Sequence, residues 1–143
     1  MRRRTVLARW LIRIPTLLYG TLPVLADLSD SHALHPEWPG HARLHVVWLI
    51  GLTTSLAAFA TYLTWTDDSL RLERTRIAAS IGLCVTGSFW VAGLTRSFYG
   101  GLFGDPNIDP GPLGFPPNLI VFAAEFVSLA IGAHLLRGGG PHD

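Results

Sequence analysis

Four long stretches of the chain consist mainly of apolar residues, and shorter polar connections separate them. A hydrocarbon core needs about 20 mostly apolar residues per helix, and each stretch comes close to that length. The second stretch is the clearest, because no charged residue interrupts it. The pattern predicts an all-α integral membrane protein, a four-helix bundle formed by residues 1–143 as one domain. The predicted spans are Trp10–Leu28, Leu44–Trp65, Ile77–Leu94 and Asn118–Leu136.

The first stretch is irregular, because Arg13, Pro15 and Pro23 lie within it. Proline is tolerated in a spanning helix where neighbouring helices or water satisfy the freed carbonyl groups. We therefore expect a kinked helix whose proline positions face protein. An alternative is a secretory signal cleaved after Ala26, since an arginine-rich start and an apolar run precede that residue.

Composition supports the membrane interpretation. Of the 143 residues, 49% are hydrophobic and 15% are charged, and the mean hydropathy is +0.36. Soluble domains carry about 25% charged residues. The net charge of +1 gives no reason to expect a nucleic-acid partner. We expect the lipid bilayer and a hydrophobic small molecule as partners, and no cofactor.

Arginine placement predicts an orientation. The proposed connections put two arginines, Arg43 and Arg96, on one side of the membrane and nine on the other. By the positive-inside rule, both termini should be cytoplasmic in a multi-pass protein of the cell membrane. The nine are Arg2, Arg3, Arg4, Arg9, Arg13, Arg71, Arg74, Arg76 and Arg137.

The sequence lacks the residues and motifs that several kinds of enzyme chemistry require. The chain has no lysine, P-loop, GxSxG elbow or dinucleotide fingerprint, so Schiff-base, phosphoryl-transfer, serine-hydrolase and NAD chemistry are not indicated. The single cysteine, Cys84, excludes an intramolecular disulfide and a CxxC site. Its apolar neighbours predict a small core residue and not a nucleophile.

Histidines gather in the connection before the second stretch. Pro39 suits the first turn of a helix, so the second helix should begin near it. His41 and His45 then share one helix face at i and i+4. Two imidazoles at that spacing can bind a metal ion or act as a general base, and His32 and His35 could add ligands. The alternative is that these histidines cap the helix, bind interfacial carbonyls or face water.

Glu125 is the residue that a membrane span accommodates least easily. It follows Asn118 by two turns and therefore lies about 10 Å below the end of the fourth stretch. An ionisable group there costs about 2.5–3.5 kcal/mol on insertion scales, so the side chain should face the bundle interior. An apolar pocket favours its neutral form, which can donate a proton. The alternative is a structural hydrogen bond between helices.

Depth places further polar and aromatic residues at the level of Glu125. Asp27 ends the first stretch, the histidine pair begins the second, and Trp90 lies near the end of the third. We therefore expect a single pocket that faces the outer half of the bilayer. Its catalytic residues would be Glu125, His45, His41 and Asp27, and its substrate-binding residues would be Trp48, Trp90 and Arg96.

Two resemblances add to this interpretation. The segment from His35 to His45 reads HPEWPGHARLH and resembles an [NH]-P-x-W-P-x-H-A-[KR]-x-H stretch of small multi-pass membrane proteins, the DUF6640-like group. That group implies no established reaction. Four spans with Asp27 in the first and Glu125 in the last are also similar to the EXPERA domain of emopamil-binding protein and its relatives. This resemblance implies intramembrane carboxylates that hold amine ligands or, in sterol isomerases, move a proton on and off a ring alkene.

The sequence thus predicts a membrane enzyme that acts on a lipid-soluble, isoprenoid-like substrate by proton transfer, as an isomerase, cyclase or hydratase. Glu125 would be the acid, His45 or His41 the base, and Asp27 an orienting or cation-stabilising carboxylate. One alternative is a non-catalytic assembly, transport-subunit or lipid-binding protein. Another is a metal-dependent enzyme with histidine ligands, namely His32, His35, His41 and His45.

Overall fold

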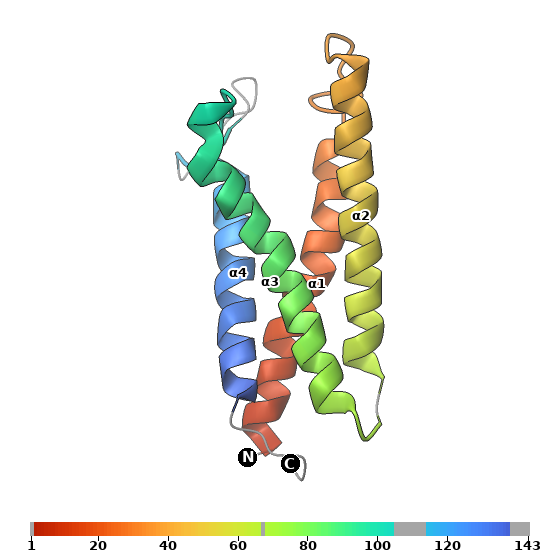
Figure 1. Ribbon diagram of the computed structural model, residues 1–143, viewed down its shortest axis with the longest axis vertical. Coiled ribbons are helices and arrows are strands. Elements are labelled where there is room, and N and C mark those ends of the chain that lie inside the picture. The colour runs from red at the N-terminus through yellow and green to blue at the C-terminus, as the bar shows by residue number, and fades with distance from the viewer. Residues whose placement is uncertain (1, 67, 105–113, 138–143) are drawn as a thin grey trace.

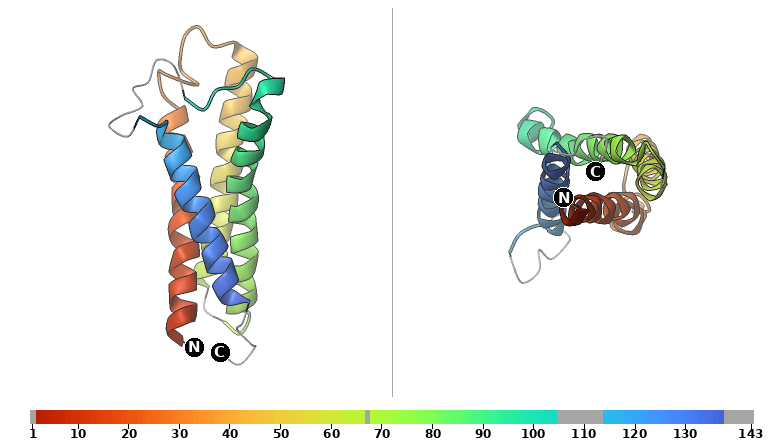
Figure 2. Two further views of the ribbon diagram at one scale, coloured as in Figure 1. Left: turned by 90° about the vertical axis from the view of Figure 1, so that its left-hand side faces the viewer. Right: turned by 90° about the horizontal axis from the view of Figure 1, so that it is seen from below.

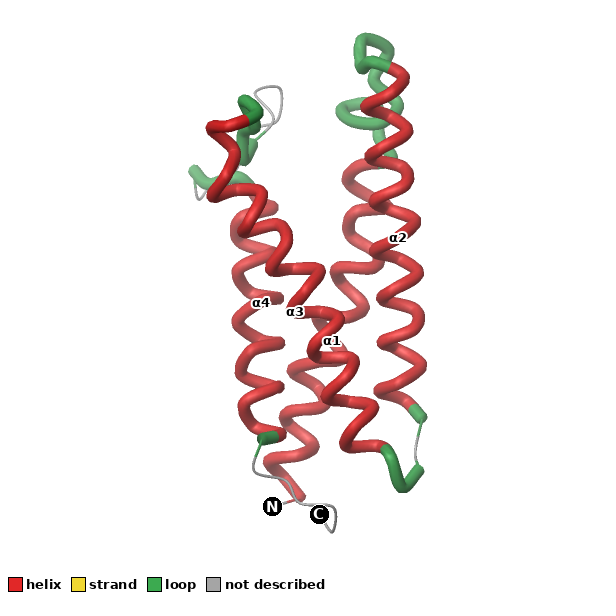
Figure 3. Tube along the Cα trace, viewed as in Figure 1, coloured by secondary structure: helices red, strands yellow, loops and turns green. Residues whose placement is uncertain are grey.

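Four long helices make up the fold in the computed structural model, which describes residues 2–66, 68–104 and 114–137 (Figure 1). A short 3-10 helix, η1 (Arg96–Phe98), follows the third helix. Helices and loops account for all described residues (Figure 3). The all-α prediction is confirmed. The long helices are α1 (Arg2–Asp27), α2 (Gly40–Trp65), α3 (Arg71–Thr95) and α4 (Pro117–Leu136).

The helices begin earlier than the apolar stretches suggested. α1 and α3 include arginine-bearing first turns, because hydropathy marks the apolar section of a helix and not its polar ends. The start of the second helix was predicted correctly. Pro39 is the N-cap residue of α2, and Gly40 is its first helical residue.

The helices pack in the ring order α1–α2–α3–α4, as the view along the bundle shows (Figure 2). α1 also contacts α3 across the ring. Between the fully described helices α2 and α4, by contrast, no two Cα atoms lie within 8 Å. α1 and α3 therefore each contact all three other long helices.

The two ends of the bundle differ in charge. α1 and α3 begin, and α2 and α4 end, at one end, which we call the basic end. By the order of the helices, the nine arginines predicted for one side of the membrane belong to the basic end of the bundle. Arg43, near the start of α2, and Arg96, at the end of α3, belong to the opposite, distal end.

Three of the helices are long and apolar enough to cross a membrane. They are α2, α3 together with η1, and α4. Their outward faces carry large exposed apolar side chains such as Phe59, Ile77 and Val91, as expected for a membrane protein. α1 has the length, with 26 residues, but its arginines and prolines lower its mean hydropathy. A fourth span in α1 stays a prediction.

A hydroxyl group of a neighbouring helix compensates for one of the two prolines inside α1. Proline has no amide hydrogen, so the carbonyl four residues earlier loses its helical donor. For Pro15 that carbonyl belongs to Leu11, and Ser128 Oγ of α4 donates to it at 2.9 Å. Close to Pro23, Thr54 Oγ1 of α2 donates to the Gly20 carbonyl at 3.0 Å. α1 is thus tied to α4 at the carbonyl that Pro15 frees, and to α2 at the Gly20 carbonyl.

Small residues allow the same helices to approach closely. Gly20 of α1 abuts Ala57 of α2. A Cβ atom on Gly132 of α4 would lie 2.8 Å from Ile12 and 3.1 Å from the Ala8 carbonyl oxygen. Close approach at small residues increases van der Waals contact between membrane helices, where lipid removes most of the hydrophobic driving force.

The expectation that Cys84 is a core residue is wrong, because its side chain is exposed on α3. The buried face of α3 includes Ala78, Gly82, Thr86 and Gly93. Two residues advance a helix by about 200°, so position 84 points away from the face of Gly82.

The proline compensation on α1 predicts a coupling between Ser128 and Pro15. Ser128→Ala should lower the free energy of unfolding by about 0.6–2 kcal/mol, measured by denaturation in mixed micelles, because the Leu11 carbonyl loses its donor. In a Pro15→Ala background the same substitution should cost much less, since residue 15 regains an amide that bonds to Leu11 within the helix.

Ser88→Ala is the matched control for this cycle. Ser88 is exposed and its hydroxyl donates to the Cys84 carbonyl of its own helix at 2.7 Å. An equal cost of Ser128→Ala in both backgrounds would contradict the coupling.

Candidate functional site

Glu125 lies near the middle of α4 and faces the bundle interior, as its sequence position predicted. Its side chain is 2% exposed. It belongs to the buried stripe of α4, which also contains Leu129, Gly132 and Leu136. The spacing i, i+4, i+7 and i+11 keeps these residues on one helix face. The start of α4 at Pro117 therefore places the carboxyl about 12 Å along the helix, within the apolar section.

Glu125 is buried and has no hydrogen-bond partner within the described part of the chain. Neither carboxyl oxygen finds one among the described residues, and the same holds for the hydroxyl of Tyr19 on α1, which is 1% exposed. The two side chains are close enough to interact electrostatically. Thr16 also lies near the phenol, but its hydroxyl donates to the Ile12 carbonyl at 2.7 Å. Unpartnered buried polar groups are rare in native structures, so these two need an explanation.

A glycine on α3 makes room for Tyr19. A Cβ atom on Gly82 would lie 3.3 Å from Cε1 of the Tyr19 ring and 2.9 Å from the Leu129 side chain. One turn further along α3, Thr86 is fully buried and donates to the Gly82 carbonyl at 2.8 Å. α1, α3 and α4 thus enclose four buried polar side chains, which we call the interior polar cluster: Thr16, Tyr19, Thr86 and Glu125.

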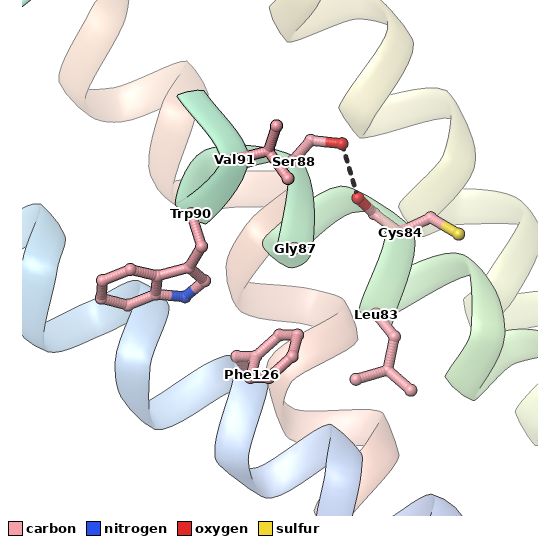
Figure 4. Close-up of a pocket in the computed structure, with 7 residues that line it drawn as sticks. All are labelled: Leu83, Cys84, Gly87, Ser88, Trp90, Val91 and Phe126. Atoms are coloured by element: carbon pink, nitrogen blue, oxygen red, sulfur yellow. Dashed lines mark hydrogen bonds between the residues drawn. The ribbon is translucent and has the colours of Figure 1, made fainter. Parts of the chain in front are cut away.

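An apolar groove lies on the outward side of α3 and α4 (Figure 4). Its volume is about 570 Å³, and the Trp90 and Phe126 rings form the side nearest α4. Trp90 was predicted to bind substrate, and the groove offers an apolar molecule contact with it. Phe126 follows Glu125 directly, so the groove and the buried carboxyl lie on adjacent faces of α4. The other lining residues are Leu83, Cys84, Gly87, Ser88 and Val91.

The structure does not bring His41 and His45 to Glu125. Both histidines are exposed on α2, and their Nε2 atoms are 3.0 Å apart. The buried residues of α2, such as Ile50, Ala57 and Ala60, lie on the opposite side of the helix. α2 is also the helix that does not touch α4, and its first turns diverge from the end of α3 (Figure 1). The predicted single pocket is therefore not assembled.

The other predicted site residues have local contacts. Trp48 is 65% exposed, with its ring centroid 6.1 Å from that of His45. Asp27 ends α1, and its carbonyl accepts a bond from the Ala33 amide at 3.0 Å. Arg96 donates to the Gly93 carbonyl at 2.8 Å and lies 4.7 Å from the Phe103 ring centroid. None of the three hydrogen-bonds to Glu125.

The HPEWPGHAR segment has a structural role that sequence reasoning missed. Arg43 donates to the carbonyls of His35, Pro36 and Trp38 at 2.6, 2.7 and 3.0 Å. The ring of His32 packs edge-on against Trp38, with centroids 5.8 Å apart. One guanidinium thus satisfies three loop carbonyls and folds residues 28–39 onto the start of α2. The sequence contains one signal for this role, namely two prolines close to Arg43. Proline-rich turns leave carbonyls without helical donors, and an arginine nearby can supply them.

Metal binding by four histidines is not supported by this arrangement. Among residues 2–66, 68–104 and 114–137, no three His, Cys, Asp or Glu side chains form a group that could hold a metal ion. His32 bonds to Ser31 at 2.9 Å, and Nδ1 of His35 accepts a bond from the Glu37 amide at 3.3 Å. These two rings are therefore engaged within the loop.

The Arg43 contacts predict a local effect of substitution. Arg43→Ala should increase amide hydrogen exchange and protease cleavage within residues 28–39, because three carbonyls lose their donor. Mass spectrometry of the digested protein measures both effects. Arg137→Ala, at an exposed position of the basic end, should leave this segment unchanged. Unaltered exchange in Arg43→Ala would show that the loop is held by other contacts.

The unpartnered state of Glu125 predicts an unusual response to substitution. Glu125→Leu should keep or raise the free energy of unfolding, by up to about 1–3 kcal/mol, because a buried polar group without a partner is removed. Leu129→Ala, one turn away, should lower it by about 2–5 kcal/mol through loss of packing. Denaturation in mixed micelles measures both values. If Glu125→Leu instead destabilises the protein as strongly as Leu129→Ala does, the carboxyl holds the helices together.

A comparison with protein families identifies the chain. The model of a family of unknown function, DUF6640, matches residues 11–138, so the chain belongs to that family. No curated protein and no solved structure matches the chain. The resemblance to the DUF6640-like group is confirmed, whereas the similarity to the EXPERA domain stays a prediction.

Proposed function

We propose that this DUF6640 protein is an integral membrane enzyme that transfers protons on a lipid-soluble substrate, with Glu125 as the acid. One observation carries the proposal. The Glu125 carboxyl is buried in the bundle, and both of its oxygens lack a partner among the described residues. A purely structural carboxyl would be hydrogen-bonded to another helix. An ionisable residue within a membrane span is by default a candidate functional group.

The chemistry follows from the surroundings of the carboxyl. A neutral Glu125 donates its proton to a carbon–carbon double bond, which leaves a carbocation and a carboxylate. Loss of a neighbouring proton to that carboxylate gives an isomerised alkene. Capture of the cation by a second alkene gives a new carbocation, and capture by water gives an oxonium ion. Loss of a proton from either one to the carboxylate then gives the cyclised or hydrated product. The ring of Tyr19 next to Glu125 offers an aromatic face that stabilises the positive charge.

The groove beside Trp90 supports a lipid-soluble, isoprenoid-like substrate. It opens on the outward faces of two membrane-capable helices, and apolar side chains dominate its lining. A molecule dissolved in the bilayer reaches such a groove without passing through water. The same groove would also serve a non-catalytic lipid-binding protein, which is the alternative function.

The arrangement of the helices also supports a fourth membrane span and an orientation in the membrane. α1 contacts the three membrane-capable helices, which favours its insertion as a fourth span. Because nine arginines belong to the basic end, the positive-inside rule supports a cytoplasmic location for that end and for both termini.

Incorporation of deuterium from D₂O into lipids tests the proposed proton transfer. Because a mixture of lipids is used, the substrate need not be known in advance. The purified full chain is reconstituted with a total lipid extract from its expression host or source membrane and incubated in D₂O. Mass spectrometry should then detect deuterium at a carbon position of at least one lipid species. Glu125→Gln should reduce this incorporation at least a hundredfold, because the amide cannot supply a proton.

The controls separate catalysis from folding. Glu73→Gln removes an exposed carboxylate at the basic end and should leave incorporation unchanged. Glu125→Gln should remain inserted and as stable as the wild type. If the wild-type protein binds lipid but no species gains deuterium above the level of protein-free vesicles, the chain is a binding protein and the proposed enzyme activity is wrong.

A further inference from the structure

The histidine pair on α2 is a second chemically active feature, outside the interior polar cluster. Nε2 of His41 and Nε2 of His45 are 3.0 Å apart, and the ring centroids are 4.5 Å apart. Both side chains are exposed. The helical spacing of i and i+4 directs the two rings to one point on the surface. The pair therefore presents two convergent nitrogen donors to solvent.

We propose that His41 and His45 form a two-ligand site for a divalent transition-metal ion, specifically Cu²⁺. Imidazole nitrogens bind such ions at about 2.0–2.1 Å. At that distance, two ligands subtending 90° are about 2.9 Å apart, whereas two ligands in a tetrahedral site are about 3.3 Å apart. The observed 3.0 Å is the length of a hydrogen bond between the two nitrogens, and it shows that both can reach a single ion. Square-planar or tetragonal coordination by nitrogen and oxygen is typical of Cu²⁺, which also binds most tightly among the first-row divalent ions.

The electrostatic surroundings permit a cation at this position. Arg43 follows His41 by two residues, so it lies on the far side of α2. Its guanidinium is engaged by the loop carbonyls of His35, Pro36 and Trp38. The positive end of the α2 dipole opposes the ion, but water and counterions screen it at this exposed site. Water molecules complete the coordination.

The site requires a change in the hydrogen bonding of the pair. Without metal, one Nε2–H group donates to the other Nε2 atom across the 3.0 Å contact. When Cu²⁺ binds both Nε2 atoms, the proton moves to Nδ1 of the same ring, which leaves both imidazoles neutral. The hydrogen bond holds the two rings in nearly the geometry that the ion needs, so little side-chain freedom is lost on binding.

Copper titration of the full chain in detergent, without a histidine tag, tests the site. One equivalent of Cu²⁺ should give an electron paramagnetic resonance spectrum of a tetragonal ion with two nitrogen ligands. Isothermal titration should show one site per chain. His41→Ala and His45→Ala should each weaken binding at least tenfold, because one chelating ligand is lost. His134→Ala, an exposed histidine near the end of α4, is the matched control and should leave binding unchanged.

Two results would overturn the assignment. Unchanged copper affinity in the double variant His41→Ala, His45→Ala would show that other groups bind the ion. An equal loss of affinity in His35→Ala would show that the loop contributes ligands and that the site is not a two-histidine site. Glu125→Gln should bind copper as the wild type does, so this test is independent of the proposed proton transfer.

Discussion

The hydrogen bond from Ser128 to the Leu11 carbonyl shows the constraint on which the bundle depends. A bilayer core offers no water, so a backbone carbonyl without a donor costs several kcal/mol there. Pro15 frees one such carbonyl in the middle of α1, and Ser128 of α4 supplies the donor. Thr54 of α2 also donates across the helix interface, to the Gly20 carbonyl of α1. α1 is therefore favoured between α2 and α4, where hydroxyl donors face it.

The same requirement organises the basic end. The last carbonyls of a helix have no donor within it. Arg9 and Arg13 of α1 donate to the Thr64 carbonyl at the end of α2, at 3.0 and 2.6 Å, and Arg76 of α3 donates to the Leu136 carbonyl of α4 at 2.8 Å. The guanidinium of Arg13 also lies 4.3 Å from the Trp65 ring centroid. Arginines that predict membrane orientation thus also close the helix ends, and Arg9 and Arg13 tie α1 to the end of α2.

Sequence patterns predicted the helices, the start of α2 near Pro39 and the inward side chain of Glu125. Each of these depends on the properties of one residue or of a short segment, and not on a distant partner. The face on which His41 and His45 lie could not be predicted. α2 is apolar on nearly all sides, and lipid accepts the same side chains as a protein core does, so hydropathy gives no information about rotation. Cys84 was misplaced for the same reason. Tyr19 and the bond from Ser128 to Leu11 were missed because each depends on a partner more than 100 residues away in the chain.

The separation of the two sites restricts the mechanism that Glu125 can support. The imidazoles of His41 and His45 are exposed on a helix that does not touch α4, so they are unsuited to receive a proton from a substrate bound at the carboxyl. In the proposed mechanism, Tyr19 is a weak base, and its main contribution would be an aromatic face. The carboxylate left after the first transfer would then be the base nearest to the cation. A single carboxyl that both donates and removes a proton acts on one face of the substrate, so the proposed isomerisation would shift the double bond suprafacially.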